Sequence, residues 1–183
     1  MLTKEQVKKR QQEAADLFSK AGIFITDQEK ANIEIADFGF GAESYENTGL
    51  GVLIYVNTDR VCAKELAMLP HQTCPEHWHP SVGTKLGKEE TFRCRWGTMY
   101  LYIPGEATPE PKSKTPAGKE KYYTVWHEIE LGPGQQYTLF PDTPHWFQAG
   151  DEGAVVSEFS TSSTDENDLF TDPNIKRITK IVE

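Results

Sequence analysis

From about residue 35 onward, the chain is a succession of short segments rich in Val, Ile, Tyr, Phe and Thr, each ended by Gly or Pro. No helical segment separates them, and many short strands in a row are typical of a β-sandwich or a β-barrel. We therefore predict a mainly β fold. The expected strands are residues 50–57, 62–69, 72–79, 90–96, 98–103, 122–131, 136–140, 145–148 and 154–160.

The N-terminal segment has the period of a helix instead. Thr3 and Gln6 are spaced as a capping box, in which each side chain satisfies an end donor of the other residue's backbone. An apolar stripe follows, and Gly22 is the kind of residue that ends a helix. We expect one amphipathic α-helix over residues 3–20. Its stripe consists of Val7, Ala14, Leu17, Phe18 and Ala21.

The composition narrows the possible partners. The formal net charge is −9, whereas nucleic acid or an anionic membrane would require a basic surface, so we expect neither partner. The first residues contain no apolar signal segment, and no stretch is long enough to span a bilayer. Cys62, Cys74 and Cys94 are odd in number and scattered, which is typical of reduced thiols. We expect a cytoplasmic protein that acts on a neutral, polar small molecule.

Two histidines are spaced for one strand face. His77 and His79 stand two residues apart, and side chains at that spacing point to the same side of a strand. This spacing alone is a weak signal, because it often occurs without a bound ligand. Downstream, alternate positions of KEETFRCRWG place Lys88, Glu90, Phe92, Cys94 and Trp96 on one mostly apolar face. Glu90, not Glu89, is therefore the inward acid.

A buried carboxylate needs a partner, because an unpaired buried charge is costly. The partner of Glu90 could be an arginine or a metal ion held together with the histidines. His145 follows PDTP at a turn that enters a strand, which suits a further ligand at a barrel mouth. His127 lies on an apolar strand face, so we expect it in the core or next to the ligands. His71 follows Pro70 at a turn and is expected to be solvated.

We predict a metal site formed by three imidazoles and one carboxylate, with open positions for a substrate. Mixed nitrogen and oxygen ligands favour Mn²⁺, Fe²⁺, Co²⁺, Ni²⁺ or Zn²⁺ over Ca²⁺. The expected ligands are His77, His79, Glu90 and His145.

These residues resemble the cupin superfamily. Its first motif is His-x-His, then Glu, six residues and Gly, which here are His77-Trp78-His79, Glu90 and Gly97, with a longer loop between them and no preceding Gly. The second motif resembles LGPGQQYTLFPDTPHWFQ. The resemblance covers roughly residues 50–160 and implies a single cupin β-barrel of the jelly-roll type. Residues 1–183 would form one domain, with the N-terminal helix in 1–22, an exposed excursion over 104–121, and a C-terminal segment over 161–183.

Two charged side chains share inward faces with this site. Lys88 lies two residues from Glu90, and Glu158 follows Ala154 and Val156 on one strand face. They could form a salt bridge with one another. Alternatively, Glu158 could act as the base that moves a proton between C1 and C2 of a sugar, while Lys88 donates to an oxygen.

Over its whole length the chain is similar to the cupin D-lyxose isomerases. The segments that carry this similarity are MLPHQTCPEHWHP, GKEETFRCRWG, FPDTPHWFQ and SEFSTSSTDENDLFTDP. The similarity implies Mn²⁺, with Co²⁺ as a possible substitute, a homodimer, and catalytic roles for Lys88, Glu158 and Asp168, with Asp165 and Asp172 nearby. It implies interconversion of D-lyxose with D-xylulose, and of D-mannose with D-fructose, through a metal-stabilised enediolate. The alternatives are a cupin Fe²⁺ dioxygenase and a non-catalytic sugar-binding cupin.

Overall fold

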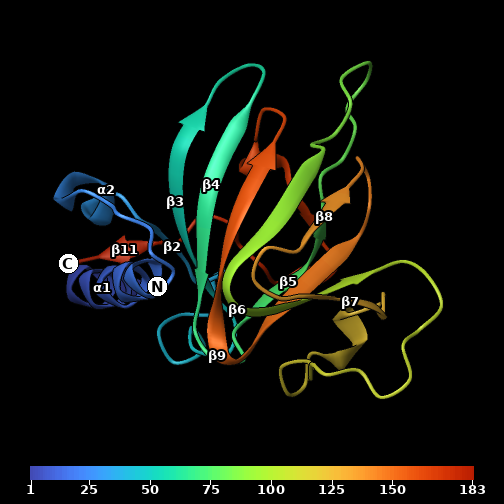
Figure 1. The fold of residues 1–183 in the computed structure, drawn as a ribbon, viewed down its shortest axis with the longest axis horizontal. Coiled ribbons are helices and arrows are strands. Elements are labelled where there is room, and N and C mark those ends of the chain that lie inside the picture. Colours follow the sequence, from blue (N-terminus) through green and yellow to red (C-terminus); the bar gives the residue numbers. More distant parts are fainter.

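The computed structural model describes residues 1–183, the side chain of Glu166 excepted. A curled antiparallel sheet forms the body, and a helical segment lies against one side of it (Figure 1). The elements are β1 (Leu2–Thr3), α1 (Lys4–Lys20), α2 (Asp27–Ala31), β2 (Glu34–Ala36), β3 (Leu50–Asn57), β4 (Cys62–Met68), β5 (Thr73–Trp78), β6 (Glu90–Ile103), β7 (His127–Leu131), β8 (Gln136–Leu139), β9 (His145–Ser160), β10 (Leu169–Phe170) and β11 (Ile181–Val182), with short 3₁₀ turns at Glu120–Tyr122 and Asp165–Asn167.

Two long strands curl the sheet. β9 pairs with β5 near its start and with β4 near its end, and β6 pairs along β9 while also pairing with β7 and β8. The sheet order is β10-β5-β9-β4-β3-β2, with β6, β7 and β8 branching from it. The predicted mainly β fold is confirmed.

The sequence predicts two strands, 90–96 and 98–103, where the structure has one strand with an irregularity at Gly97. Residues 90–103 form one strand with register shifts on both sides of Gly97, whose φ is 69°. A β-carbon at Gly97 would lie 2.1 Å from the Gly153 carbonyl oxygen, so only glycine fits this close crossing. The bulge also turns Trp96 toward the helix side of the sheet, although strict alternation places it on the face of Glu90.

The N-terminal helix matches its prediction. Thr3 and Gln6 form the capping box, and Gly22 follows the helix end with a φ of 71°. Phe18 is fully buried against the outer face of the sheet, where it meets Leu53 and Val155. Burial of one such side chain stabilises the fold by ~1.5–3 kcal/mol. The first and last strands lie beside this helix, where β1 and β11 pair in parallel (Figure 1).

Residues 104–121 are mostly exposed, as expected of the excursion between β6 and β7. The strand predicted over 122–131 is shorter in the structure: β7 begins at His127, and Tyr123 before it packs on Trp146 in an aromatic cluster with Tyr102. α2 and β2 are short additions that the sequence did not predict. Among the described residues, no helix has both the length and the apolar composition that a membrane span requires.

The interior of the barrel is apolar at one end and charged at the other. On β4, β6 and β9, the inward positions near one end are apolar, and the same faces carry charged side chains at the other end. The charged positions are Lys64 on β4, Glu90 on β6 and Glu158 on β9, and all three are almost fully buried. The polar end of the barrel therefore holds the candidate site.

Candidate metal centre

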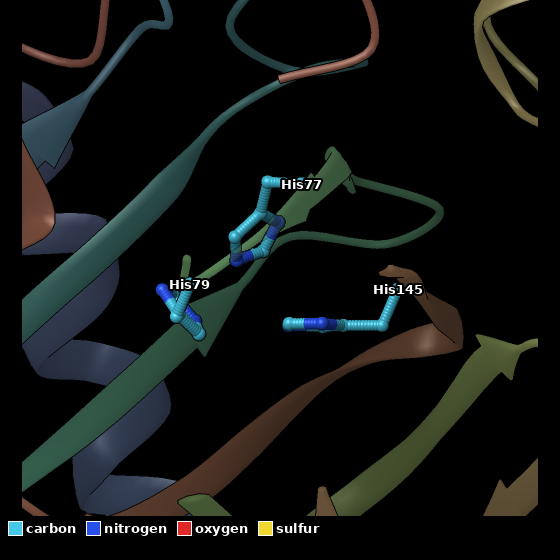
Figure 2. A group of neighbouring side chains, drawn as sticks. All are labelled: His77, His79 and His145. Atoms are coloured by element: carbon cyan, nitrogen blue, oxygen red, sulfur yellow. The ribbon is translucent and has the colours of Figure 1, made fainter. Parts of the chain in front are cut away.

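Three histidines meet at the polar end of the barrel. His77 lies in β5, His79 follows the end of that strand, and His145 begins β9. His77 and His145 are direct partners in the strand register, so the two strands bring their rings together. One ring nitrogen of each histidine lies within 4.8 Å of those of the other two, and the three rings surround one space (Figure 2).

Each ring is held by the nitrogen that faces away from this space. Nδ1 of His77 lies 2.8 Å from the Pro75 carbonyl oxygen, and Nδ1 of His145 lies 2.9 Å from that of Thr143. Nδ1 of His79 lies 2.5 Å from Asp168 Oδ1. An Nδ1–H that donates to these oxygens leaves the lone pair on Nε2, which is the usual arrangement behind a metal-bound histidine. Three lone pairs therefore converge.

Glu90 completes the set. Its Oε1 lies 3.0 Å from His79 Nε2 and 3.1 Å from His145 Nε2. Adjacent ligands of an octahedral ion with bonds of about 2.1 Å lie ~3.0 Å apart, so both distances fit a shared cation. His145 Nε2 is buried and finds no hydrogen-bond partner among the described atoms, as expected of an atom reserved for a metal ion. The donors present fit a divalent metal ion.

The electrostatics agree with a bound cation. Burial and the two neighbouring imidazoles lower the pKa of His77 well below its ordinary value, so this ring is neutral and free to coordinate. Burial would raise the pKa of Glu90, but Lys88 and His79 hold it well below its usual range. Burial would also lower the pKa of His79, but the Glu90 and Asp168 carboxylates outweigh it and raise the pKa to about 9. Without a metal ion, His79 therefore carries a second proton on Nε2. A bound metal ion would take the place of that proton.

A chain of ion pairs continues from the histidines. Lys88 Nζ lies 2.7 Å from Glu90 Oε2 and 3.0 Å from Glu158 Oε1, so the salt bridge left open by the sequence exists. Beyond Glu158, the chain passes through Lys64, Asp165 and Arg177 to Glu34 on β2. With Asp168 included, five carboxylates face three cations in this network. With His79 neutral, as a metal ligand is, the excess of two negative charges matches one divalent cation.

Asp168 comes close to the site through β10. This strand pairs with β5, and Phe170 stands opposite His77 and stacks on its ring. Asp168, at the entry to β10, reaches Nδ1 of His79 from behind. Asp165 pairs with Lys64, and Asp172 pairs with Lys119. Of the three aspartates Asp165, Asp168 and Asp172, Asp168 is thus the one that contacts a histidine of the site.

The sequence analysis missed Lys64 and Arg177, and it named Asp165 only as a neighbour of Asp168. Lys64 had a usable signal, because Cys62, Lys64 and Leu66 alternate onto one inward strand face, in the manner that pointed to Glu158. Arg177 lies outside any periodic segment, so no sequence pattern marks it.

Two other histidines lie away from the centre. The prediction for His127 was wrong: its ring is partly exposed at the start of β7, with Nδ1 3.0 Å from the Glu106 carbonyl oxygen. The alternating face on which the sequence places His127 includes Val125, and the structure puts Val125 before β7 rather than in it. His71 is exposed, as predicted, and has a φ of 58°.

Two adjoining spaces lie at the site. An inner cavity of about 40 Å³ is lined by the charged network and by apolar side chains such as Phe92 and Phe147. An outer pocket of about 270 Å³ lies between residues 79–88 and 162–168. His79, Lys88 and Asp168 line both, so they form the wall between the outer pocket and the inner cavity.

A family model described as D-lyxose isomerase matches residues 2–183. The chain belongs to the D-lyxose isomerase family. It is 62% identical to the D-lyxose/D-mannose isomerase of Thermosediminibacter oceani, over 99% of both chains. It is 60% identical to a D-lyxose ketol-isomerase of Thermofilum sp., over the full length of both. This membership confirms the similarity seen in the sequence and the prediction of a sugar isomerase.

Solved structures support the fold. The L-ribose isomerase of Acinetobacter sp. DL28, in complex with L-ribose, superposes with a TM-score of 0.82 at 18% identity, covering 99% of this chain and 98% of that chain. The Cellulomonas parahominis L-ribose isomerase gives a TM-score of 0.81 at 17% identity with the same coverage. At these identities the likeness establishes the fold alone. The family model and both relatives carry the names of isomerases. Family membership therefore favours the isomerase over the dioxygenase and the non-catalytic sugar-binding protein.

Proposed function

We propose that this enzyme interconverts D-lyxose with D-xylulose, and D-mannose with D-fructose, by proton transfer next to a divalent metal ion. The ion would be held by His77, His79, Glu90 and His145. One observation carries the proposal: nitrogen and carboxylate lone pairs converge at distances that suit a metal ion, beside a carboxylate with one uncommitted oxygen. The names of the 60% and 62% identical relatives support the choice of sugars.

Glu158 is the proposed base. Both lysines near it contact Oε1, and none of the described residues donates a hydrogen bond to Oε2. Oε2 takes the proton from C2 of the open-chain aldose, and the C–H electrons form the C1–C2 double bond as the carbonyl electrons move onto O1. Return of the proton to C1, with transfer of the O2 proton to O1, gives the ketose. The reaction is redox-neutral and needs no co-reactant.

Lys88 is the proposed donor to a substrate oxygen. Its ammonium contacts Glu90 and Glu158, and an ammonium has three donors, so one N–H remains. Burial would lower the pKa of Lys88, but Glu158 and Glu90 keep it well above its ordinary value. A lysine that stays charged stabilises negative charge as it develops on oxygen.

Asp168 lines the cavity and holds His79 by its Nδ1, so we propose that it acts through the orientation of that ring. When bound, the metal ion would supply Lewis-acid polarisation of the sugar carbonyl. The donor set is the kind that binds Mn²⁺, with Co²⁺ as a substitute.

The outer pocket gives the substrate a route to the site past Lys88. A water molecule takes about 30 Å³ in the liquid, so the inner cavity of about 40 Å³ holds little more than one, and a pentose needs the outer pocket as well. The outer pocket lies between residues 79–88 and 162–168, and movement there would admit the sugar.

A coupled ketose assay tests the proposed function. Protein stripped with chelator and reloaded with Mn²⁺ is incubated anaerobically with D-lyxose and with D-mannose. We expect ketose from both sugars, dependent on the added metal. Metal-loaded protein that forms no ketose would overturn the proposal, and oxygen uptake by iron-loaded protein would favour the dioxygenase.

We also propose that the enzyme is a cytoplasmic homodimer. Cys62, Cys74 and Cys94 are free and buried, which agrees with a reducing compartment. Light scattering coupled to size-exclusion chromatography tests the assembly. We expect twice the chain mass, and a mass equal to one chain would contradict the dimer.

A further inference from the structure

Lys64 is a buried lysine that the proposed mechanism does not use. It is 3% exposed, lines the inner cavity, and stands directly opposite Glu158 in the register between β4 and β9. Its Nζ lies 3.0 Å from Ser163 Oγ, 3.0 Å from both Asp165 oxygens and 3.5 Å from Glu158 Oε1. With three partners for three donors, this ammonium has nothing left to offer a substrate.

Lys64 and Lys88 approach the same oxygen of Glu158. Lys88 lies 3.0 Å from Oε1 and Lys64 lies 3.5 Å from it. Because both ammonium groups lie at Oε1, they restrict rotation of the Glu158 carboxylate about its Cγ–Cδ bond. Oε2 then points away from the two lysines. The two lysines thus determine that Oε2, and not Oε1, is the oxygen of Glu158 without a hydrogen-bond donor.

Lys64 is itself fixed from the side of the C-terminal segment. Asp165 binds Arg177 through Oδ2 at 2.8 Å, and Arg177 also contacts Glu34 on β2. Burial would lower the pKa of Lys64, but Glu158 and Asp165 raise it, so it stays charged. This ammonium therefore cannot move freely with a substrate.

We propose that Lys64 is a positioning residue that acts through Glu158. It holds Oε1 against β4, so that Oε2 keeps the orientation needed to carry the proton. This inference rests on the proposed function, in which Glu158 is the base. The side-chain contacts of Lys64 are with Ser163, Asp165 and Glu158, and none of these is a proposed metal ligand. Lys64 should therefore affect the proton-transfer step and leave metal binding unchanged.

A double-mutant cycle tests this role. The variants are Lys64→Met, Glu158→Gln and the double variant, all loaded with Mn²⁺ and assayed on D-lyxose, with exposed Lys20→Met as the control. We expect Lys64→Met to lower kcat by ~10²-fold, since a misplaced group costs about that much, with KM and metal content nearly unchanged. If Lys64 acts only through Glu158, the double variant loses no more kcat than Glu158→Gln alone.

The assays distinguish failure of the Lys64 role from failure of the isomerase proposal. A Lys64→Met enzyme with wild-type kcat, or a double variant whose losses multiply, would overturn the role of Lys64 while leaving the isomerase proposal standing. Wild-type protein that forms no ketose would overturn both. If Lys64→Met does not fold, Lys64→Gln answers the same question through the same cycle, because it keeps a hydrogen-bond donor, one atom shorter, without the charge.

Discussion

The side chains of His79 and Asp168 meet at 2.5 Å, although 89 residues separate them in the chain. The contact exists because β10 pairs with β5 and brings the C-terminal loop behind the histidine strand. A carboxylate in this position fixes the ring and makes its free nitrogen a stronger ligand. The C-terminal segment therefore holds one histidine of the candidate metal site from outside that site.

Asp168→Asn should weaken metal binding without removing a ligand. An amide in this place keeps the shape but loses the charge that supports His79, and such outer partners are worth ~10–100-fold in affinity. Titration of chelator-treated protein with Mn²⁺ measures the change. Asp172→Asn, in the same loop but paired with Lys119, is the matched control and should bind as wild type does. Equal affinities for both variants would contradict the role of Asp168.

His145→Ala should lower metal content as well as rate. Its Nε2 is one of the buried side-chain atoms without a hydrogen-bond partner among those described, as expected of a metal ligand. Plasma emission on the purified variant measures occupancy. His71→Ala removes an exposed histidine and should keep full occupancy. Unchanged metal in His145→Ala would remove this residue from the proposed ligand set.

Glu158→Gln should bind sugar and metal but lose turnover. The amide has nearly the same shape but cannot take a proton, and the loss of a general base costs ~10²–10⁴-fold in kcat. The matched control is Glu65→Gln, on the outer face of β4, where Glu65 contacts Ser157. Steady-state kinetics and sugar binding by calorimetry distinguish the two variants. If Glu158→Gln keeps full activity, another group is the base.

Asp165→Asn should destabilise the fold at neutral pH more than in acid. Burial would raise the pKa of Asp165, but Lys64 and Arg177 hold it well below its usual range. Its contribution is therefore present above the unfolded pKa of about 3.9 and is lost as the pH falls toward the folded value. Removal of one partner of a buried pair costs ~3 kcal/mol in the free energy of unfolding. Urea unfolding of both proteins measures this difference, which should shrink below pH ~4. A difference that stays constant with pH would contradict the assignment.

The sequence contains much of the site because strand alternation is local. It placed Glu90 inward and Glu89 outward, and the structure buries the first and exposes the second. It also paired His77 with His79 on one face, since two residues make one period of a strand. These positions follow from neighbours in the chain, without knowledge of the fold.

The rest depends on long-range pairing. The contact of Asp168 with His79 requires β10 to lie beside β5, and the contact of Lys64 with Glu158 requires the register of β4 on β9. No local pattern specifies either pairing. The sequence predicted a break at Gly97 but not its cause, which is the close approach of Gly153 from another strand.

Anomalous diffraction from crystals of the Mn²⁺-loaded enzyme, recorded at the manganese edge, tests the central claim most directly. We expect one strong peak at bonding distance from Nε2 of His77, His79 and His145 and from Oε1 of Glu90. A peak elsewhere, or none in crystals of active enzyme, would contradict the metal centre derived from these four side chains.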